Sequence, residues 1–121
     1  MKVSVSVTNS FKIAAKPLFK KYRSLTRDLS SLEKELLLIP RLGNHLGNDA
    51  YKIRLKISSK QKGKSGGARV ISLVEANIVG VAQVISGEEI VVNLITIFDK
   101  SDVDNISDKE LKDLIRNFRS K

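Results

Sequence analysis

Residues 51–57 alternate between apolar and basic side chains, and this alternation restricts the possible folds more than any other feature of the chain. The two sets are Tyr51, Ile53, Leu55 and Ile57 on one parity and Lys52, Arg54 and Lys56 on the other. Successive residues of a β-strand point to opposite faces of its sheet. The pattern therefore predicts a strand that packs on a core with one face and presents basic side chains on the other.

A glycine-rich basic segment follows this strand and predicts a mobile loop over residues 58–67. Its lysines are Lys60, Lys62 and Lys64, and Arg69 then opens the next apolar run. No acidic residue occurs between Asp49 and Glu75, whereas a surface that only maintains solubility intersperses both signs of charge. We therefore favour recognition of an anion, the backbone of RNA or DNA, over a merely soluble surface.

The composition favours one strongly basic domain over residues 1–121. The chain has 22 Lys plus Arg against 13 Asp plus Glu, and its formal net charge of +9 favours a polyanionic partner. It has no cysteine, which excludes disulfides and thiol chemistry and permits a reducing cytoplasm. Neither a secretory leader nor a membrane-spanning stretch is evident, so we expect a cytoplasmic protein that does not bind membranes.

Two kinds of periodicity predict an α+β fold. Alternation at residues 3–8 predicts a first strand, and two apolar stripes at helical spacing predict a helical hairpin over residues 11–39. Near the end, Ser107 and Glu110 form a capping box in front of an amphipathic helix.

The second half of the chain supplies further strands. Apolar runs at residues 70–74, 78–85 and 90–98 are typical of strands, with a bulge or break between the first two and a turn at residues 86–89. Short connections favour a mainly antiparallel sheet of four to five strands. We expect the N-terminal helical hairpin to back this sheet and the C-terminal helix to lie on the same face.

Several familiar site types do not fit the residues present. The G-K-S sequence at residues 63–65 lacks the first glycine of a phosphate loop, because Ser58 takes its place and a strand follows. His45, the only histidine, lies in a Gly/Asn-rich turn typical of a surface residue, and one histidine without cysteine cannot form a zinc site. The carboxylates between Asp99 and Asp108 favour turn and capping roles over Mg²⁺ binding, so we expect no metal or cofactor.

Three longer motifs resemble the RelE/HigB group of toxins from bacterial type II toxin–antitoxin systems, within the RelE/ParE superfamily. They are YKIRL at residues 51–55, KSGGARVI at residues 64–71 and L-x-x-I-F-DKSD-x-x-NISDKEL at residues 94–111. The helical hairpin FKKYRSLTRDLSSLEKELLLIPRLGNHLGN fits the same group, and the resemblance extends from about Phe11 to Phe118.

The resemblance implies a RelE-like toxin that cuts mRNA on the ribosome without a metal and is neutralised by a cognate acidic antitoxin. The 2′-hydroxyl would attack the adjacent phosphorus and leave a 2′,3′-cyclic phosphate. The residues that match catalytic positions of these toxins are Lys52, Arg54, Arg69 and Lys100. Of these, Arg69 would stabilise the transition state. The positions expected to bind RNA are Lys56, Lys60, Lys62 and Lys64.

Two alternatives to an endoribonuclease remain open at this stage. One is a toxin of the related ParE group, which would inhibit gyrase. The other is a module that binds RNA or an antitoxin without catalysis, because Phe98 and Lys100 stand where some relatives carry a histidine or tyrosine.

Overall fold

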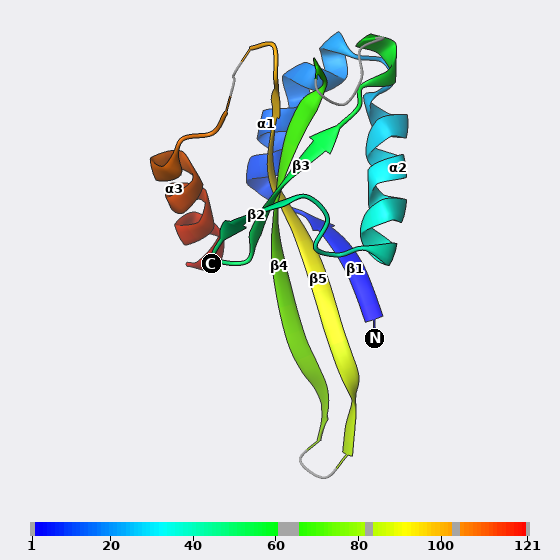
Figure 1. Ribbon diagram of the computed structural model, residues 1–121, viewed down its shortest axis with the longest axis vertical. Coiled ribbons are helices and arrows are strands. Elements are labelled where there is room, and N and C mark those ends of the chain that lie inside the picture. The colour runs from blue at the N-terminus through cyan, green and yellow to red at the C-terminus, as the bar shows by residue number, and fades with distance from the viewer. Residues whose placement is uncertain (1, 61–65, 82–83, 103–104, 121) are drawn as a thin grey trace.

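The structure is a computed structural model that describes residues 2–60, 66–81, 84–102 and 105–120. Its strands are β1 (Lys2–Val7), β2 (Asn44–Gly47), β3 (Ala50–Leu55), β4 (Ala68–Val81) and β5 (Val84–Asp99). Its helices are α1 (Asn9–Lys21), α2 (Leu25–Leu38) and α3 (Asp108–Arg119), and a short 3₁₀ helix, η1 (Ser58–Lys60), follows β3. The α+β class is as predicted (Figure 1), but β2 lies in the Gly/Asn-rich segment that the sequence predicts to be a turn.

The described strands form one sheet of five strands in the order β1-β5-β4-β3-β2. From β2 to β5 each strand pairs antiparallel with the next, as expected. β1 instead runs parallel to β5, with Lys2 opposite Glu89 and Val7 opposite Leu94, so the prediction of an antiparallel sheet is wrong at this edge. The whole helical hairpin separates β1 from the other strands, and a connection of that length does not impose the antiparallel direction of a tight turn.

Both the first and the last helix begin at a side-chain cap. Thr8 caps α1, because its Oγ1 accepts a hydrogen bond from the Phe11 backbone N–H at 3.2 Å. Ser107 caps α3 through its Oγ, which accepts from the Glu110 backbone N–H at 3.1 Å and lies 3.1 Å from the Glu110 carboxylate. The N-cap predicted at Ser107 is therefore confirmed, and the Glu110 carboxylate accepts a hydrogen bond from the Ser107 hydroxyl.

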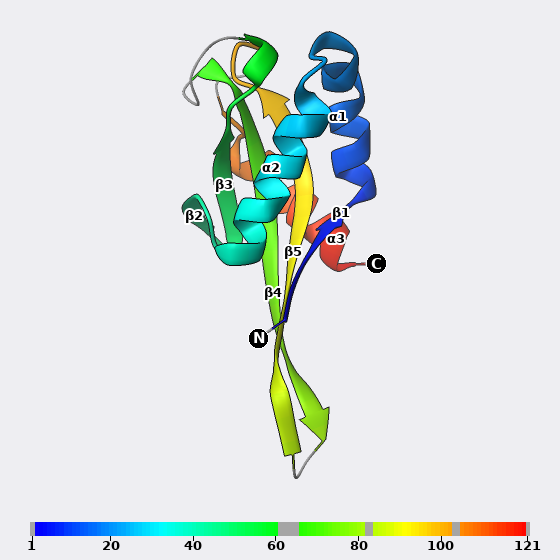
Figure 2. The same ribbon diagram turned by 90° about the vertical axis from the view of Figure 1, so that its right-hand side faces the viewer.

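α1 and α2 form the predicted hairpin and cover one face of the sheet (Figure 2). Their apolar stripes pack on strand residues of the same face and build the larger of two cores, in which Leu25, Leu36, Val70 and Val92 have no exposed surface. The hairpin therefore backs the sheet, as predicted.

α3 lies on the opposite face, where Leu111 and Ile115 pack against Ile71 and Leu73 in a second, smaller core. The expectation that all helices share one face is therefore wrong. Residues 70–74 of β4 are all buried, and alternate residues face opposite sides of the sheet. β4 therefore needs a covering element on each side. α3 covers only part of its face (Figure 1).

β4 and β5 continue past the other strands as a two-stranded ribbon (Figures 1 and 2). β4 runs without a break through Ala76 and Asn77, where the sequence suggested a bulge or a separate strand. Residues 86–89 belong to β5, so the turn predicted there is wrong. The pairing of Val81 with Val84 closes the hairpin earlier in the chain.

Candidate nucleic-acid interface

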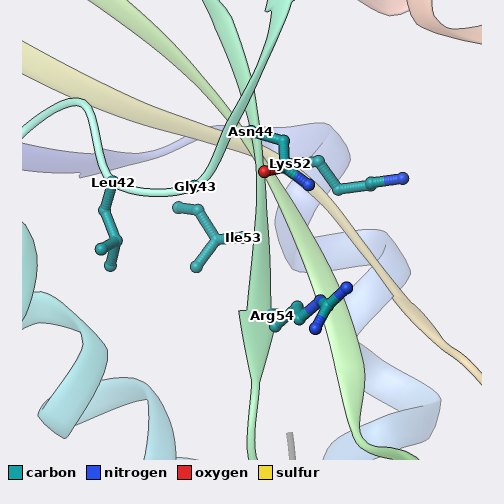
Figure 3. Close-up of a pocket in the computed structure, with 6 residues that line it drawn as sticks. All are labelled: Leu42, Gly43, Asn44, Lys52, Ile53 and Arg54. Atoms are coloured by element: carbon teal, nitrogen blue, oxygen red, sulfur yellow. The ribbon is translucent and has the colours of Figure 1, made fainter. Parts of the chain in front are cut away.

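β3 divides its side chains between the two faces of the sheet, as the alternation predicts. Ile53 and Leu55 are buried in the core beneath α1 and α2, with 2% and 5% of their surface exposed. Lys52 is half-buried and Arg54 exposed, and Figure 3 shows both pointing away from Ile53. The basic side chains therefore lie on the face that α3 covers only in part.

Arg54 and Arg69 are direct cross-strand neighbours on β3 and β4. Phe98 of β5 pairs with Arg69 on its other side, so the three residues form one row across the sheet. Residues directly opposite each other on one face have Cβ atoms about 4.5–5.5 Å apart. Two arginines beside an aromatic ring make a surface suited to a phosphate and a neighbouring base.

Arg69 is a buried cation, with only 6% of its surface exposed. Its Nη1 donates a hydrogen bond to the Ala68 carbonyl at 3.1 Å. Burial lowers the pKa of Arg69, and the positive charge of Arg54 lowers it further. Arginine remains charged at neutral pH, because its ordinary pKa lies far above neutrality. An anion bound between the two arginines would relieve their repulsion.

Lys52 occupies the next row of the same face, about 7 Å from Arg54 along the strand. Its Nζ donates to Asn105 Oδ1 at 3.2 Å. The same oxygen accepts from the Ile106 backbone N–H at 3.0 Å, so Asn105 is held in place as it orients Lys52. Sequence reasoning missed the role of Asn105, although this residue opens the NIS segment of the third motif.

Lys100 follows β5 directly, and its backbone N–H donates to the Gly67 carbonyl at 3.0 Å. This contact brings Lys100 to the start of β4, the end of the sheet that carries Arg69. The preceding Asp99 is 2% exposed and accepts a hydrogen bond from the Tyr22 hydroxyl at 2.5 Å. Asp99 is thus a buried anchor for the end of β5 as well as the turn residue that the sequence suggested.

A pocket of about 380 Å³ opens at the edge of the sheet beside Lys52 and Arg54 (Figure 3). Gly43 forms part of its wall with φ at +101°, and a Cβ there would collide with the Lys52 carbonyl oxygen. Only glycine permits this approach. β2 begins at Asn44, opposite Lys52, so within the described part of the chain no strand pairs with the outer edge of β3, the edge away from β4, beyond Lys52. The backbone of β3 at Arg54 therefore borders an open edge.

The lysines expected to bind RNA all follow β3 in the sequence. Lys56 is exposed. The side chain of Lys60 and the whole of Lys62 and Lys64 lie outside the described residues, so these predictions stay predictions.

Asp28 anchors the segment in which this basic loop begins. It is 6% exposed and accepts hydrogen bonds from the Ser58 N–H at 3.0 Å, the Ser58 hydroxyl at 2.6 Å and the Ser24 hydroxyl at 2.7 Å. Burial by itself raises the pKa of Asp28, but the hydrogen bonds from Ser58 and Ser24 outweigh it, and the net pKa is lowered. Sequence reasoning missed this anchor, although an acid between Leu25 and Leu32 on an apolar stripe signals a buried carboxylate.

The structure thus brings Lys52, Arg54, Arg69 and Lys100 to one end of the sheet. Neither a scan against protein-family models nor a search of curated proteins finds a match to the chain. The resemblance to RelE/HigB toxins therefore rests on the sequence motifs. Among the described residues, no helix has the length and apolar character needed to cross a membrane.

Proposed function

We propose that this protein is the toxin of a type II toxin–antitoxin pair and a metal-independent, ribosome-dependent mRNA endonuclease. It acts in the cytoplasm and is neutralised by a cognate acidic antitoxin. The observation that carries the proposal is the row of Arg54, Arg69 and Phe98 on the sheet face that α3 covers only in part, with Lys52 in the adjoining row. The sequence motifs that resemble RelE/HigB toxins contain these same residues.

The proposed reaction is an internal transfer of the phosphoryl group within mRNA. The 2′-oxygen forms a bond to the adjacent phosphorus while the bond from phosphorus to the 5′-oxygen breaks. A base removes the proton of the 2′-hydroxyl, and an acid protonates the departing 5′-oxygen. The products are a 2′,3′-cyclic phosphate and a 5′-hydroxyl.

Arg69 and Arg54 suit the charge that develops on the phosphoryl oxygens, because fixed donors act most strongly where water is partly excluded. Lys52 and Lys100 are the candidates for proton transfer, since each can act as a base when neutral and as an acid when charged. Asn105 orients Lys52, and the Asp99–Tyr22 hydrogen bond positions the backbone that carries Lys100. Phe98 offers a surface on which a base of the RNA can stack.

The test is cleavage of a defined mRNA in a purified translation reaction, mapped by primer extension and by the chemistry of the new ends. We expect the wild-type protein to cut within the ribosomal decoding site and Arg69→Gln to be about a hundredfold slower. Lys109→Gln is the matched control, because this exposed lysine of α3 has no proposed role. Circular dichroism must show that Arg69→Gln is folded. Intact mRNA with the wild-type protein would refute the proposal.

Binding without cleavage is the second candidate function. Its support is the position of the only histidine, His45, which lies on β2 against Tyr51 with ring centroids 5.0 Å apart and is not in the Arg54–Arg69 row. A ribosome block without new RNA ends would identify such a binder. Damaged DNA with intact message would instead identify a gyrase inhibitor.

A further inference from the structure

The ribbon formed by β4 and β5 has an edge that no other described strand covers. The last pair between β3 and β4 joins Ala50 to Leu73. Beyond this pair, the Val74 N–H donates to the Asp49 carbonyl at 2.9 Å. From residue 75 to residue 81, β4 pairs only with β5 among the described strands. Figures 1 and 2 show this part of the ribbon projecting away from the three helices.

The sequence of the ribbon lacks the features that normally protect a free strand edge. Natural proteins place charges, especially lysine, or proline on such edges. Residues 76–87 contain no charged residue and no proline, and residues 70–99 contain no lysine or arginine, although the chain has 22 of them. An isolated two-stranded ribbon is only marginally stable in water. A further strand on this edge would therefore stabilise the ribbon.

The alternation of the backbone identifies the groups that lie on the open edge. The Val74 N–H points away from β5, because it reaches Asp49 on the side of β3. Successive N–H groups of a strand point alternately to its two neighbours, and the pairing of β4 with β5 is regular from Val74 to Val79. The N–H of Ala76 therefore points to the open edge, whereas the N–H of Asn77 points to β5.

We propose that residues 75–81 of β4 pair antiparallel with the same residues of a second copy of this chain. The two ribbons then join into one sheet of four strands, and a two-fold axis makes the contact self-complementary. Two molecules of net charge +9 repel each other, but the ribbon carries no positive charge and holds the basic bodies at opposite ends of the dimer. The same lack of cations makes a nucleic acid a poor occupant of this edge.

This dimer goes beyond the proposed function and does not depend on it. Arg69 lies at the start of β4, whereas the paired edge begins at Glu75. The Arg54–Arg69 row is therefore outside the contact and stays accessible in both copies. Dimer formation and RNA cleavage can fail separately, because each is measured without the other.

Sedimentation velocity at increasing protein concentration tests the dimer, and the wild-type protein should shift from monomer to dimer. Ala76→Pro should weaken the dimer at least about tenfold, because it removes an N–H from the open edge and none from the β4–β5 ladder. Ala76→Thr is the matched control, since it retains the N–H and should preserve the dimer. Circular dichroism at a dilution where all three proteins are monomeric must show the same fold.

Two outcomes of sedimentation would overturn the proposal. One is a wild-type protein that stays monomeric at every concentration, as expected if the edge receives an extended segment of another protein. The other is a dimer that Ala76→Pro leaves as tight as the wild-type dimer.

The salt dependence of the dimer distinguishes edge pairing from attraction between opposite charges. Added salt should strengthen an edge-paired dimer, because it screens the repulsion between the two basic bodies. Glu75 and Glu88 are exposed and could instead meet basic side chains of the other copy. Salt would dissociate a dimer of that kind, and this result would overturn the proposal.

Distances between spin labels test where the two copies meet. The chain has no cysteine, so a single introduced cysteine labels one position in each copy. With Asn77→Cys, on the ribbon, the two labels should lie within about 30 Å of each other. With Lys56→Cys, at the far end of the sheet, they should lie more than about 50 Å apart, given a rise of about 3.4 Å per residue. The reverse order of distances would place the contact on the bodies and overturn the proposal.

Discussion

The two faces of the sheet use alternate residues of the same strands for different purposes. On the side of α1 and α2, β3 contributes Ile53 and Leu55 to a continuous apolar core. On the other side it contributes Lys52 and Arg54, which α3 leaves at least partly accessible. In β4 the same alternation separates buried Val70 from Arg69, a cation with only 6% of its surface exposed.

The comparison shows that the two faces contribute to stability with opposite signs. Apolar burial on the helix-covered face stabilises the fold, whereas the crowded positive charges on the other face destabilise it. Arg69 is costly to bury, and the nearby charge of Arg54 adds repulsion. A large apolar core behind the same strands offsets that cost. Substitutions on the two faces should therefore affect different measurable quantities.

The largest effect on stability is expected from Ile53→Ala. This side chain is 2% exposed, and its truncation should lower the free energy of unfolding by about 2–5 kcal/mol, because it leaves a cavity in the larger core. Urea denaturation measures the loss, with Ile13→Ala, at 68% exposure, as a control that should change it by less than about 0.5 kcal/mol. A small loss for Ile53→Ala would mean that the helix-covered face is not the main source of stability.

Asp28→Asn should have an intermediate effect and tests a buried carboxylate on the helix-covered side. Loss of its charge-assisted hydrogen bonds should cost about 1–3 kcal/mol at neutral pH. The pKa of Asp28 is lowered by folding, so its stabilisation is complete above the unfolded value of about 3.9 and disappears as the pH falls through the lower folded-state pKa. Urea denaturation of both proteins at several pH values measures how their difference in the free energy of unfolding depends on pH.

The control for Asp28 is Asp113→Asn, which removes exposed ion pairs with Lys109 and Arg116 and should cost less than about 1 kcal/mol. A difference between Asp28→Asn and wild type that persists far below a pH of about 3.9 would contradict the role of the carboxylate charge.

The smallest effect on stability is expected from Arg54→Ala, the neighbour of Ile53. The free energy of unfolding should change by less than about 0.5 kcal/mol, because Arg54 is exposed and its loss removes repulsion from Arg69. In binding to single-stranded RNA, the slope of log affinity against log salt should fall in magnitude by about 0.7, the contribution of one phosphate contact. Titration at several salt concentrations measures the slope, and an unchanged slope would remove Arg54 from the interface.

Much of the fold was predictable, because periodicity is a local property of the sequence. The alternation at residues 51–57, the stripes of α1 and α2 and the capping box of α3 each specify one element. The direction of β1 was not predictable, because it depends on how a helical hairpin packs. The placement of α3 was also missed, although the two-sided burial at residues 70–74 required cover on both faces.

The candidate site was predictable in part: the face of the sheet was, but the neighbours of each side chain were not. The parity of β3 placed Lys52 and Arg54 on one face, but their neighbours depend on register between distant strands. The register pairs Arg69 with both Arg54 and Phe98, and no local pattern specifies such a row. Asn105 was missed for the same reason, because its contact with Lys52 spans 53 positions of the chain.

The parallel pairing of β1 with β5 has a consequence for the order of folding. Residues 2–7 find their strand partners only at residues 89–94, whereas β3, β4 and β5 pair with neighbours along the chain. Closing a long loop costs conformational entropy, and this cost comes before the contacts between the loop ends can offset it. Local hairpins therefore form before distant pairings. We expect the first strand of the chain to join the sheet last and the flank of β5 to remain exposed until it does.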